Sequence, residues 1–354
     1  MTQTTHFPPP IQDRGGPAQP LLVVRDLKKH FAVRGSPLER SKKFVHAVDG
    51  VSFSVPKGKT LGIVGESGCG KSTTARLIAR LMAADAGSMV FDGEGVEEFG
   101  GIRLKEFRRN LQMVFQDSFA SLNPRLTIAE TIAYGPRVHG MPAAEAMRQA
   151  RDLLARVGLE PEQFASRYPH ELSGGQRQRV NIARALAFDP RLVILDEAVA
   201  ALDKSVQAQV LNLLQELKAE RQLTYLFISH DLHVVHYISD YVMVMYLGQV
   251  VETGPVERIY GQAAHPYTRA LLSAVPSMDP DNRTQASPLV GDPPNPINPP
   301  SGCRFRDRCP HAHPVCAAQA PLLIGIAGEP AHQAACHLND PASGHPAALT
   351  EIQP

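Results

Sequence analysis

The sequence lacks the long apolar run that a membrane span requires. Its 354 residues are 43% hydrophobic and 20% charged, and no stretch approaches the about 18 consecutive apolar residues of a spanning helix. We therefore expect a globular protein that does not itself cross a membrane. The chain also lacks a surplus of one charge, since its formal net charge is +1. Nucleic acid and anionic membranes favour a clearly basic surface, so the composition gives no reason to expect either partner.

The first twenty residues lack the features of a signal peptide. They contain five prolines and no apolar core flanked by basic residues. We expect residues 1–20 to form a disordered leader and the protein to be cytoplasmic. Cysteine is also scarce over most of the chain, because four of the five cysteines lie within the last 52 residues. In a reducing compartment such a cluster favours a metal or cluster site over disulfides.

The segment 65–72 is a glycine-rich loop of the form G-x-x-x-x-G-K-[ST]. It follows the apolar run 61–64 and leads into 73–82, where apolar residues recur at helical spacing, so we predict a strand, a loop and a helix. Glycines let backbone N–H groups point inward, and with a helix N-terminus behind them they form a nest for a triphosphate. Lys71 is expected to reach the β and γ phosphates and Ser72 to bind Mg²⁺. The predicted nucleotide-binding residues are Gly65, Glu66, Ser67, Gly68, Cys69, Gly70, Lys71, Ser72 and Thr73, with only a steric role for Cys69.

Two strands are predicted before this loop, over residues 21–33 and 47–55. Phe31, in the first of them, has two interpretations. Its ring could stack on an adenine face ahead of the phosphate loop, or it could be an ordinary side chain of the sheet core. Spacing alone does not separate these interpretations.

A block of helices interrupts the α/β pattern. Residues 111–115 form a predicted strand that ends in Gln116, and helical periodicity then runs from 127 to 190. Such a block indicates an inserted helical subdomain. Inside it, the sequence Leu-Ser-Gly-Gly-Gln at 172–176 precedes a predicted helix over 177–187. The orphan N–H groups at a helix N-terminus attract anions, so the chain has a second phosphate-like site.

Two further strands end in polar side chains. The apolar run Leu-Val-Ile-Leu ends in Asp196 and Glu197, and carboxylates at the carboxyl end of a parallel strand can hold Mg²⁺ through water. A strand that ends in two acids is also a common surface turn. After a predicted helix over 204–221, the β-rich run 223–228 leads to His230. A lone histidine is usually structural.

Together these motifs resemble the nucleotide-binding domain of ABC transporters, over roughly residues 21–275. The glycine loop, Gln116, the Leu-Ser-Gly-Gly-Gln sequence, the Asp-Glu pair and His230 follow in the family's order. The Leu-Ser-Gly-Gly-Gln sequence between a phosphate loop and an Asp-Glu strand is highly specific. The resemblance implies an α/β P-loop NTPase of the ABC type, with a RecA-like core, an antiparallel β subdomain and an inserted helical subdomain. It also favours adenine stacking for Phe31.

The resemblance implies a role for each motif. In the family, two domains close head to tail around two ATP molecules, so that the signature residues of one domain contact the ATP held by the other. The residue matching Glu197 polarises the attacking water, and the residue matching His230 contacts the γ-phosphate. Gln116 matches a residue that contacts Mg²⁺ and the water. The implied catalytic residues are Glu197, His230 and Gln116; the Mg²⁺ ligands are Ser72, Gln116 and Asp196; the residues contacting the partner's ATP are Ser173, Gly174, Gly175, Gln176 and Asp203.

One segment departs from the family's pattern. Peptide-importer members usually read Glu-Pro-Val-Ser-Ala-Leu-Asp where residues 197–203 read Glu-Ala-Val-Ala-Ala-Leu-Asp. Ala198 in place of proline adds backbone freedom beside the base, and Ala200 in place of serine removes a hydroxyl group. Because every charged residue of the segment remains, we still predict ATP hydrolysis.

The C-terminal region resembles the extension of dipeptide, oligopeptide and nickel importer ATPases. The resemblance rests on His-Pro-Tyr-Thr-Arg at 265–269, a proline-rich link and four cysteines spaced C-x5-C-x6-C-x19-C. Four thiolates can hold an iron–sulfur cluster or tetrahedral zinc. The lack of C-x2-C pairs disfavours zinc, nearby histidines keep it open, and some members of the family carry a [4Fe-4S] cluster here. Free buried thiols are the third alternative. The residues are Cys303, Cys309, Cys316 and Cys336.

The sequence as a whole predicts the ATPase subunit of a peptide importer at the cytoplasmic face of the inner membrane. The implied partners are a second, homologous ATPase subunit, two membrane permeases and a periplasmic peptide-binding protein. The alternatives are nickel or murein peptides as cargo, or a soluble ABC ATPase, which a single nucleotide domain without heptads disfavours. The expected divisions are a leader at 1–20, a nucleotide-binding domain at 21–260 with its helical subdomain at about 120–185, the extension at 261–340 and a flexible tail at 341–354.

Overall fold

The computed structural model of the chain describes residues 16, 19–33, 43–96, 101–274, 291, 294–326 and 328–348. Most of the expected leader, much of the proline-rich link and the last six residues of the expected tail lie outside the described residues. The chain divides into two compact units. The first contains Met1–Val23, Ser54–Lys59 and Met89–Leu226, and the second contains Val24–Phe53, Thr60–Ser88 and Phe227–Pro354.

Four strands contribute residues to both units. They are β1 (Pro20–Ala32), β2 (Phe44–Pro56), β4 (Ala86–Phe91) and β8 (Thr224–Ile228). β1, β2 and β8 match the strands predicted from alternating and apolar runs. The short strand β5 (Glu94–Gly95) pairs antiparallel with β4 in the first unit, which gives the polar hairpin that follows the phosphate-loop helix.

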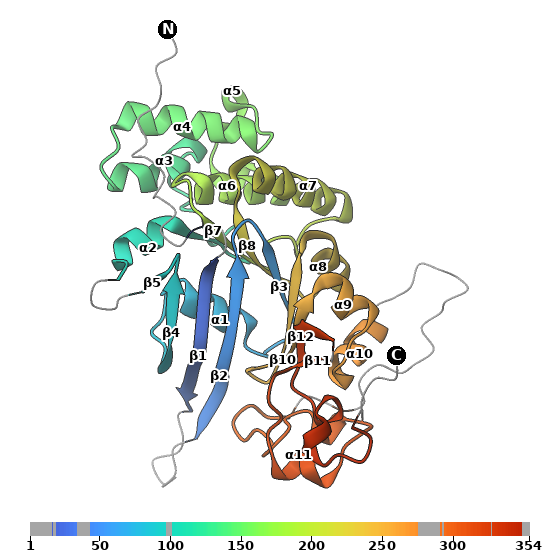
Figure 1. Ribbon diagram of the computed structural model, residues 1–354. Helices are drawn as coiled ribbons and strands as arrows, with labels where there is room; N and C mark the ends of the chain where they lie inside the picture. Colours follow the sequence, from blue (N-terminus) through green and yellow to red (C-terminus); the bar gives the residue numbers. More distant parts are fainter. Residues whose placement is uncertain are drawn as a thin grey trace. The chain divides into compact units, whose positions relative to one another are not determined.

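Helices dominate the first unit. α3, α4 and α6 pack on one another, and α6 also contacts α7 (Figure 1). α4 buries Ala146, Ala150, Leu153 and Leu154, which lie three or four residues apart and so share one face of the helix. The helices are α2 (Leu104–Asn110), α3 (Ile128–Val138), α4 (Ala143–Arg156), α5 (Pro161–Phe164), α6 (Gly174–Leu186) and α7 (Lys204–Arg221), with a 3-10 turn at Pro169–Glu171.

The strands of the first unit bring two predicted polar positions to the ends of neighbouring strands. β6 (Leu111–Val114) runs parallel to β7 (Leu192–Asp196), with Leu111 opposite Leu192. Every residue of β7 is buried, as its apolar run predicted. Neighbouring parallel strands end at the same edge of a sheet. Gln116, which comes after β6, and Asp196, the last residue of β7, therefore lie at the same edge of this pair.

In the second unit, strands from the C-terminal region continue the sheet that carries the phosphate loop. The order is β11 (Ile324–Ile326), β12 (Glu329–Ala334), β10 (Gln249–Pro255), β9 (Tyr241–Tyr246) and β3 (Thr60–Val64). β3 and β9 are parallel, and the other three pairs are antiparallel. β12 and β11 lie beside β10 in Figure 1, where these two strands are drawn in red.

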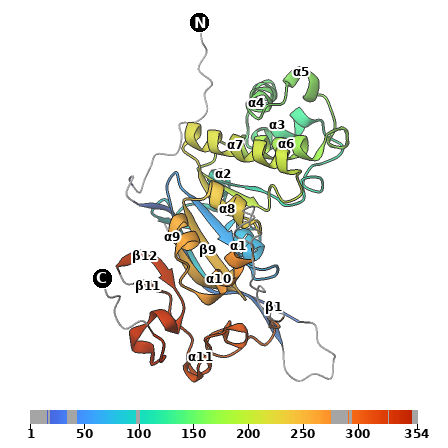
Figure 2. The same cartoon turned by 90° about the vertical axis from the view of Figure 1, so that its right-hand side faces the viewer.

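The helices of the second unit are short. α9 packs on β9 and β10 (Figure 2), and α8 packs on β3. Their bounds are α1 (Lys71–Ile78), α8 (Leu232–Ile238), α9 (Val256–Gly261), α10 (Pro266–Ser273) and α11 (Pro314–Ala318), with 3-10 turns at Arg306–Arg308, His337–Asn339 and Pro341–Ser343.

A buried carboxylate fixes the extension to this sheet. Glu252 on β10 has no exposed surface and accepts hydrogen bonds from the N–H groups of Ala264, at 2.7 Å, and His265, at 3.0 Å. Nε2 of His332 on β12 lies 2.7 Å from the same carboxylate. Burial alone would raise the pKa of Glu252, but these hydrogen bonds outweigh burial and hold that pKa below its ordinary value. Glu252 therefore ties β12 and the start of α10 to β10.

Candidate nucleotide-binding and hydrolysis site

The phosphate loop follows the fully buried strand β3. Gly65, with φ of 146°, and Gly70, with φ of 107°, have backbone conformations that side chains rarely adopt. A Cβ on Gly65 would lie 2.2 Å from the carbonyl oxygen of Met245, and one on Gly70 would lie 2.2 Å from that of Ala47. Neighbouring backbone therefore requires glycine at both positions.

Lys71 reaches back into the loop that precedes it. Its side chain is buried, with the residue 6% exposed, and its Nζ donates to the carbonyl oxygens of Gly65, at 2.7 Å, and Glu66, at 2.9 Å. The ammonium group thus lies within the turn of the loop, where the resemblance expects it to meet phosphate oxygens. Ser72 and Thr73 follow it in the first turn of α1. Burial raises the pKa of the Cys69 thiol, which therefore stays protonated at neutral pH and fits the steric role expected of it.

Phe31 is not a core side chain. It lies near the end of β1 and is 39% exposed, with the ammonium of Lys29 5.7 Å from its ring centroid. The sheet-core interpretation of Phe31 is therefore wrong, and its exposed ring fits the stacking interpretation. His230, after β8, is also exposed.

In the first unit the structure brings Gln116 and Glu197 together. Nε2 of Gln116 donates to Oε2 of Glu197 at 2.6 Å, although the two residues lie 81 positions apart. Glu197 has a φ of 48°, in the left-handed region that non-glycine residues rarely adopt. Strained backbone of this kind concentrates at functional sites. Asp196, next to it, is 2% exposed at the end of β7.

The Leu-Ser-Gly-Gly-Gln sequence at 172–176 leads into α6, with Ser173 at its N-cap and Gly174–Gln176 in its first turn. The hydroxyl of Ser173 accepts the N–H of Gln176, and the side chain of Gln176 accepts the N–H of Ser173 at 2.9 Å, which is a capping box. The sequence placed the helix start at 177, three residues late, because glycine is a poor helix former. A Cβ on Gly175 would lie 2.4 Å from Val206 on α7, so that position is closed to side chains. Asp203, before α7, is exposed and its carboxylate does not cap the helix.

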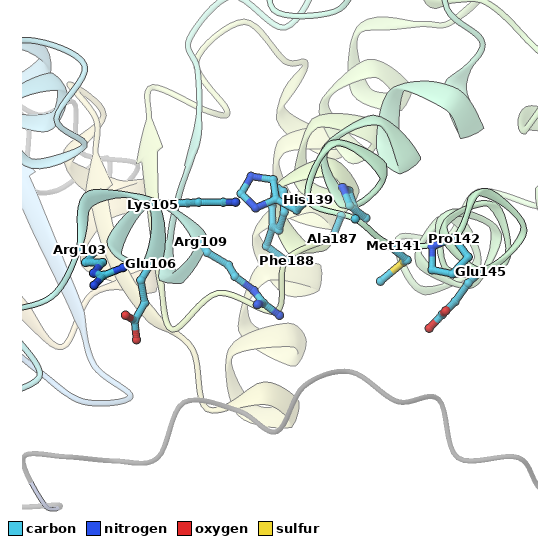
Figure 3. Close-up of a pocket in the computed structure, with 12 residues that line it drawn as sticks. Arg103, Lys105, Glu106, Arg109, His139, Met141, Pro142, Glu145, Ala187 and Phe188 are labelled. Atoms are coloured by element: carbon cyan, nitrogen blue, oxygen red, sulfur yellow. The ribbon is translucent and has the colours of Figure 1, made fainter.

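A pocket of about 440 Å³ opens between α2 and the turn that joins α3 to α4. Figure 3 shows Lys105 of α2 directed toward His139; Arg109 of the same helix and Phe188 also line the pocket. The His139 and Phe188 rings meet edge to face at 4.9 Å. Burial, together with the charges of Lys105 and Arg109, lowers the pKa of His139. The pocket lining therefore combines more cations than carboxylates with several apolar side chains; besides the residues already named it includes Arg103, Glu106, Met141, Pro142 and Glu145.

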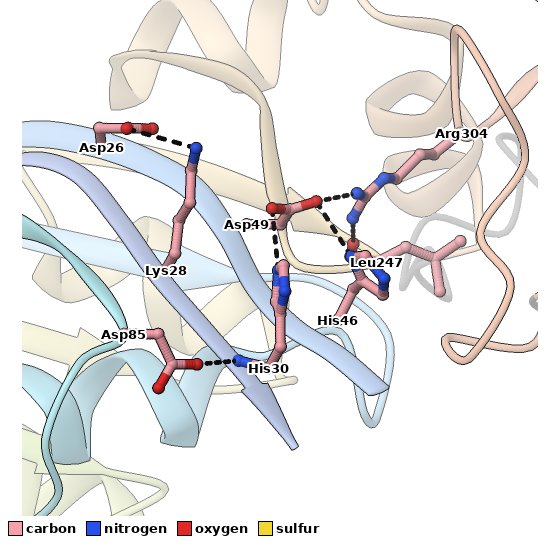
Figure 4. A network of polar contacts seen from close by, with 8 residues as sticks. All are labelled: Asp26, Lys28, His30, His46, Asp49, Asp85, Leu247 and Arg304. Atoms are coloured by element: carbon pink, nitrogen blue, oxygen red, sulfur yellow. Dashed lines mark hydrogen bonds and ion pairs between the residues drawn. The ribbon is translucent and has the colours of Figure 1, made fainter. Parts of the chain in front are cut away.

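Two groups in the second unit contain possible metal ligands. Within the part of the chain that the structure describes, His30, His46 and Asp49 are the one group of three His, Cys, Asp or Glu ligand atoms that lie within 4.8 Å of one another. The carboxylate of Asp49 also pairs with Arg304 (Figure 4). A cation bound there would be repelled by the guanidinium, so we interpret this group as a polar network.

The second group is the set of four C-terminal cysteines, which line one small enclosed cavity. Burial and the neighbouring thiols raise the pKa of Cys303 to about 11 and that of Cys336 to about 12. No three of the four sulfur atoms lie within 4.8 Å of one another, since no described cysteine belongs to a group of that kind. The sulfurs that share one tetrahedral zinc lie closer together than this. In a [4Fe-4S] cluster each thiolate binds a different iron, so its four sulfurs lie farther apart than those of a zinc site.

Sequence reasoning missed two residues that contact the phosphate loop. Tyr267 of α10 and Arg308 of the extension both hydrogen-bond to Glu66. The sequence pattern contains no signal for these contacts, because they join positions 201 and 242 residues apart.

The chain matches two protein families. Residues 48–200 match the family described as ABC transporter, and residues 251–316 match the oligopeptide/dipeptide transporter, C-terminal region. The chain is 51% identical over 322 residues to the oligopeptide transport ATP-binding protein AppF of Bacillus subtilis. The matched region covers 90% of this chain and 97% of that protein.

Solved structures of ATP-binding cassettes share the fold. One is cbiO1 from Clostridium perfringens, part of the ABC transporter complex cbiONQ, with a TM-score of 0.58 and 27% identity over 69% of this chain and 91% of that one. Another is a dimeric ATP-binding cassette in a post-hydrolysis state with ADP and Pi, with a TM-score of 0.56 and 28% identity over 66% of this chain and 98% of that one.

Across the described part of the chain, none of the helices has the length and apolar character needed to cross a membrane. The matched families and the relative at 51% identity confirm the P-loop NTPase fold of ABC type and the ATPase class predicted from the sequence. The chain therefore belongs to the ABC transporter family, in the branch of ATP-binding proteins that carry the oligopeptide/dipeptide transporter C-terminal region.

Proposed function

We propose that the chain is the ATP-hydrolysing motor subunit of an importer that takes up peptides. The observation that carries this proposal is the combination of an ABC domain with an oligopeptide/dipeptide transporter C-terminal region in one chain. The relative of 51% identity is named for oligopeptide transport. In this proposal residues 21–260 form the nucleotide-binding domain and residues 261–340 form the extension.

The proposed reaction is the hydrolysis of ATP by water to ADP and phosphate. Lys71 and the loop N–H groups would hold the phosphates, and Ser72, Gln116 and Asp196 would be the ligands of Mg²⁺, which would neutralise phosphate charge. Glu197 takes a proton from the attacking water, while His230 stabilises the charge that develops on the γ-phosphate. The 2.6 Å contact between Gln116 and Glu197 supports a shared role at the attacking water.

The proposed unit of function is a pair of ATPase chains. Ser173, Gly174, Gly175, Gln176 and Asp203 of one chain would contact the ATP held by the other. The exposure of Ser173 and Asp203 supports this arrangement, because both side chains are open to a partner. The partners we propose are a homologous second ATPase, two membrane permeases and a periplasmic peptide-binding protein, at the cytoplasmic face of the inner membrane.

The basic pocket on the first unit is the surface we propose for a permease. Its three cations, Lys105, Arg109 and Arg103 (the basic rim), outnumber the carboxylates of Glu106 and Glu145 and therefore favour an acidic side chain, while Met141 and Phe188 accept an apolar one. A cytoplasmic segment of a permease that carries both kinds of side chain fits this combination.

Peptide uptake by the assembled importer tests the motor role. Vesicles that contain the wild-type chain, its partner ATPase and the permeases are expected to import peptide with ATP and the binding protein, and not with a non-hydrolysable analogue. The Lys105→Glu/Arg109→Glu chain is expected to bind ATP normally but to lose most of its copurification with the permeases, because the rim charge is reversed. Glu216→Gln on the exposed face of α7 is the control. ATP binding without ATP-dependent uptake by the wild-type assembly would contradict the importer assignment.

For the four cysteines we propose a [4Fe-4S] cluster, with Zn²⁺ as the alternative. Cys303, Cys309, Cys316 and Cys336 would be the ligands, and the cluster would cross-link the segments that carry them. The cavity that all four cysteines line supports a shared site, and the finding that no three of their sulfurs lie within 4.8 Å of one another favours the cluster over zinc in this proposal.

Metal analysis of the full chain tests the cysteine site. Protein purified without oxygen is expected to be brown and to contain about four iron atoms and four labile sulfides per chain, the stoichiometry of the cluster. A Cys336→Ser chain is expected to lose most of the iron and the colour, whereas Cys69→Ser is expected to keep both. About one zinc per chain would establish the alternative ligand, and protein free of both metals would refute a metal site.

A further inference from the structure

Glu66, the second residue of the phosphate loop, is held at three points. Its carboxylate accepts two hydrogen bonds from Arg308, at 2.8 and 3.0 Å, in a bidentate pair. Its N–H donates to the hydroxyl of Tyr267 at 2.9 Å, and its carbonyl accepts the ammonium of Lys71 at 2.9 Å. Glu66, whose carbonyl accepts a hydrogen bond from Lys71, is therefore also hydrogen-bonded by two residues of the C-terminal region.

The Arg308 contact is well placed to fix geometry. The side chain of Arg308 is 5% exposed and that of Glu66 is 24% exposed. A bidentate pair restricts orientation as well as distance, and partial burial weakens the screening of the charges by water. Nη1 of Arg308 also lies 3.3 Å from the hydroxyl of Tyr246, so the guanidinium is held on a second side.

An aromatic cluster supports the two residues that hold Glu66. The rings of Tyr246, Tyr267 and Phe305 have centroids 4.6 to 5.4 Å apart. Tyr246 is on β9 and Tyr267 is on α10. In the sequence, Phe305 lies between Cys303 and Cys309, two of the four cysteines that line the small cavity (the cavity cysteines). Rings at these distances pack at their favoured separations. The cluster therefore joins the extension to the strand beside the phosphate loop.

A second arginine of the extension, Arg304, contacts residues that lie near another part of the phosphate loop. Arg304 donates to the carbonyl of Leu247 and pairs with Asp49, as Figure 4 shows. Gly248, which follows Leu247 in the sequence, donates its N–H to the carbonyl of Cys69 within the phosphate loop at 2.9 Å. Arg304 and Arg308 thus approach the loop through different residues, and each is adjacent in sequence to a cavity cysteine.

We propose that Arg308 is a positioning residue for nucleotide binding: through Glu66 it holds the phosphate loop and Lys71 in the geometry that receives the phosphates. The extension then acts directly on the ATP site of its own chain. This inference rests on the assignment of the loop as the nucleotide site, which the family membership supports. The predicted consequence is a change in ATP affinity rather than in the rate at which bound ATP is hydrolysed, because Arg308 contacts the loop and takes no part in the proposed chemistry.

A double-mutant cycle on the full chain tests this role. Arg308→Ala is expected to weaken ATP binding about tenfold, the effect of losing one charge-assisted pair, while hydrolysis at saturating ATP by the assembled importer changes by less than about twofold. Arg308→Lys, which keeps the charge and loses the fork, is expected to lie between Arg308→Ala and wild type. Glu66→Ala is expected to weaken binding to a similar degree, and the double variant no further.

Two controls separate this role from a general loss of structure. Arg306→Ala, in the same 3-10 turn, is expected to bind ATP like wild type, because its side chain contacts Ser301 and Asp307 rather than the loop. The charge-exchanged chain Glu66→Arg/Arg308→Glu is expected to bind ATP more tightly than either of its single variants. Wild-type affinity in Arg308→Ala, or fully additive losses in the double variant, would overturn the proposal while leaving ATP binding by the wild-type chain intact.

Discussion

Replacing Glu197 with glutamine is expected to lower kcat for ATP hydrolysis by about 10²- to 10⁴-fold, the contribution of a general base, while ATP binding stays within about twofold of wild type. The amide is close to the carboxylate in shape and can still accept the hydrogen bond that Gln116 donates at 2.6 Å. It cannot take a proton from water. The effect should therefore fall on kcat, as it does when an interaction of the transition state is removed.

The measurement is phosphate release at saturating ATP by the assembled chain pair, together with a nucleotide titration of each variant. Glu216→Gln on α7 is the matched control, since the same change at an exposed carboxylate should leave both quantities unchanged. Hydrolysis by Glu197→Gln at the wild-type rate would exclude Glu197 as the base. The absence of phosphate release above background from both wild type and Glu197→Gln would instead show that Ala198 and Ala200 accompany a site that binds ATP without hydrolysing it.

The elements that the sequence predicted well are those whose signal is local. The helix expected over 204–221 is α7 with the same bounds, because its buried residues recur at helical spacing from Val210 to Leu217. The strand before Asp196 and the turn of the phosphate loop were equally readable, since an apolar run and a glycine pattern each occupy a few consecutive residues. The ABC family followed from the order of such local motifs, and the comparisons confirm it.

The features that the sequence did not predict depend on contacts between distant positions. The sequence does not predict the helix α2, because its residues are mostly charged and only one of its two apolar residues, Phe107, is fully buried. The pairing of β12 with β10 joins Glu252 and Ala334 across 82 positions of the chain, and no periodicity in either segment identifies the partner strand. The exposure of Phe31 likewise depends on what packs over β1, which spacing cannot show.

The contacts of Glu66 show how far this limit reaches into the site. The glycine-loop pattern leaves Glu66 as a variable position, yet its side chain, N–H and carbonyl all bond to named partners. The pattern predicts the residues that bind phosphate. It does not identify the residues that hold the loop, because those come from whatever the fold places around it.

Replacing Lys71 with alanine is expected to have the second large effect, a loss of ATP affinity of about 100-fold, because charged hydrogen bonds contribute about 1.5–3 kcal/mol each and a tenfold change corresponds to about 1.4 kcal/mol. The variant loses the ammonium group that lies within the loop, and it also loses the donor that the carbonyls of Gly65 and Glu66 share. Titration of the full chain with a fluorescent ATP analogue measures the affinity, with Arg76→Ala on the exposed face of α1 as the control for a lost cation nearby.

Lys71→Arg should not restore binding, even though it restores the charge. Lys71 is 6% exposed and its ammonium lies 2.7 and 2.9 Å from two loop carbonyls. A planar guanidinium is wider than an ammonium and cannot occupy the same point between these carbonyls. Equal ATP affinity of the arginine variant and wild type would show that only the positive charge matters at this position. A weak affinity in both variants, with unchanged unfolding temperatures, would show that the loop requires an ammonium group at the point where its two carbonyls converge.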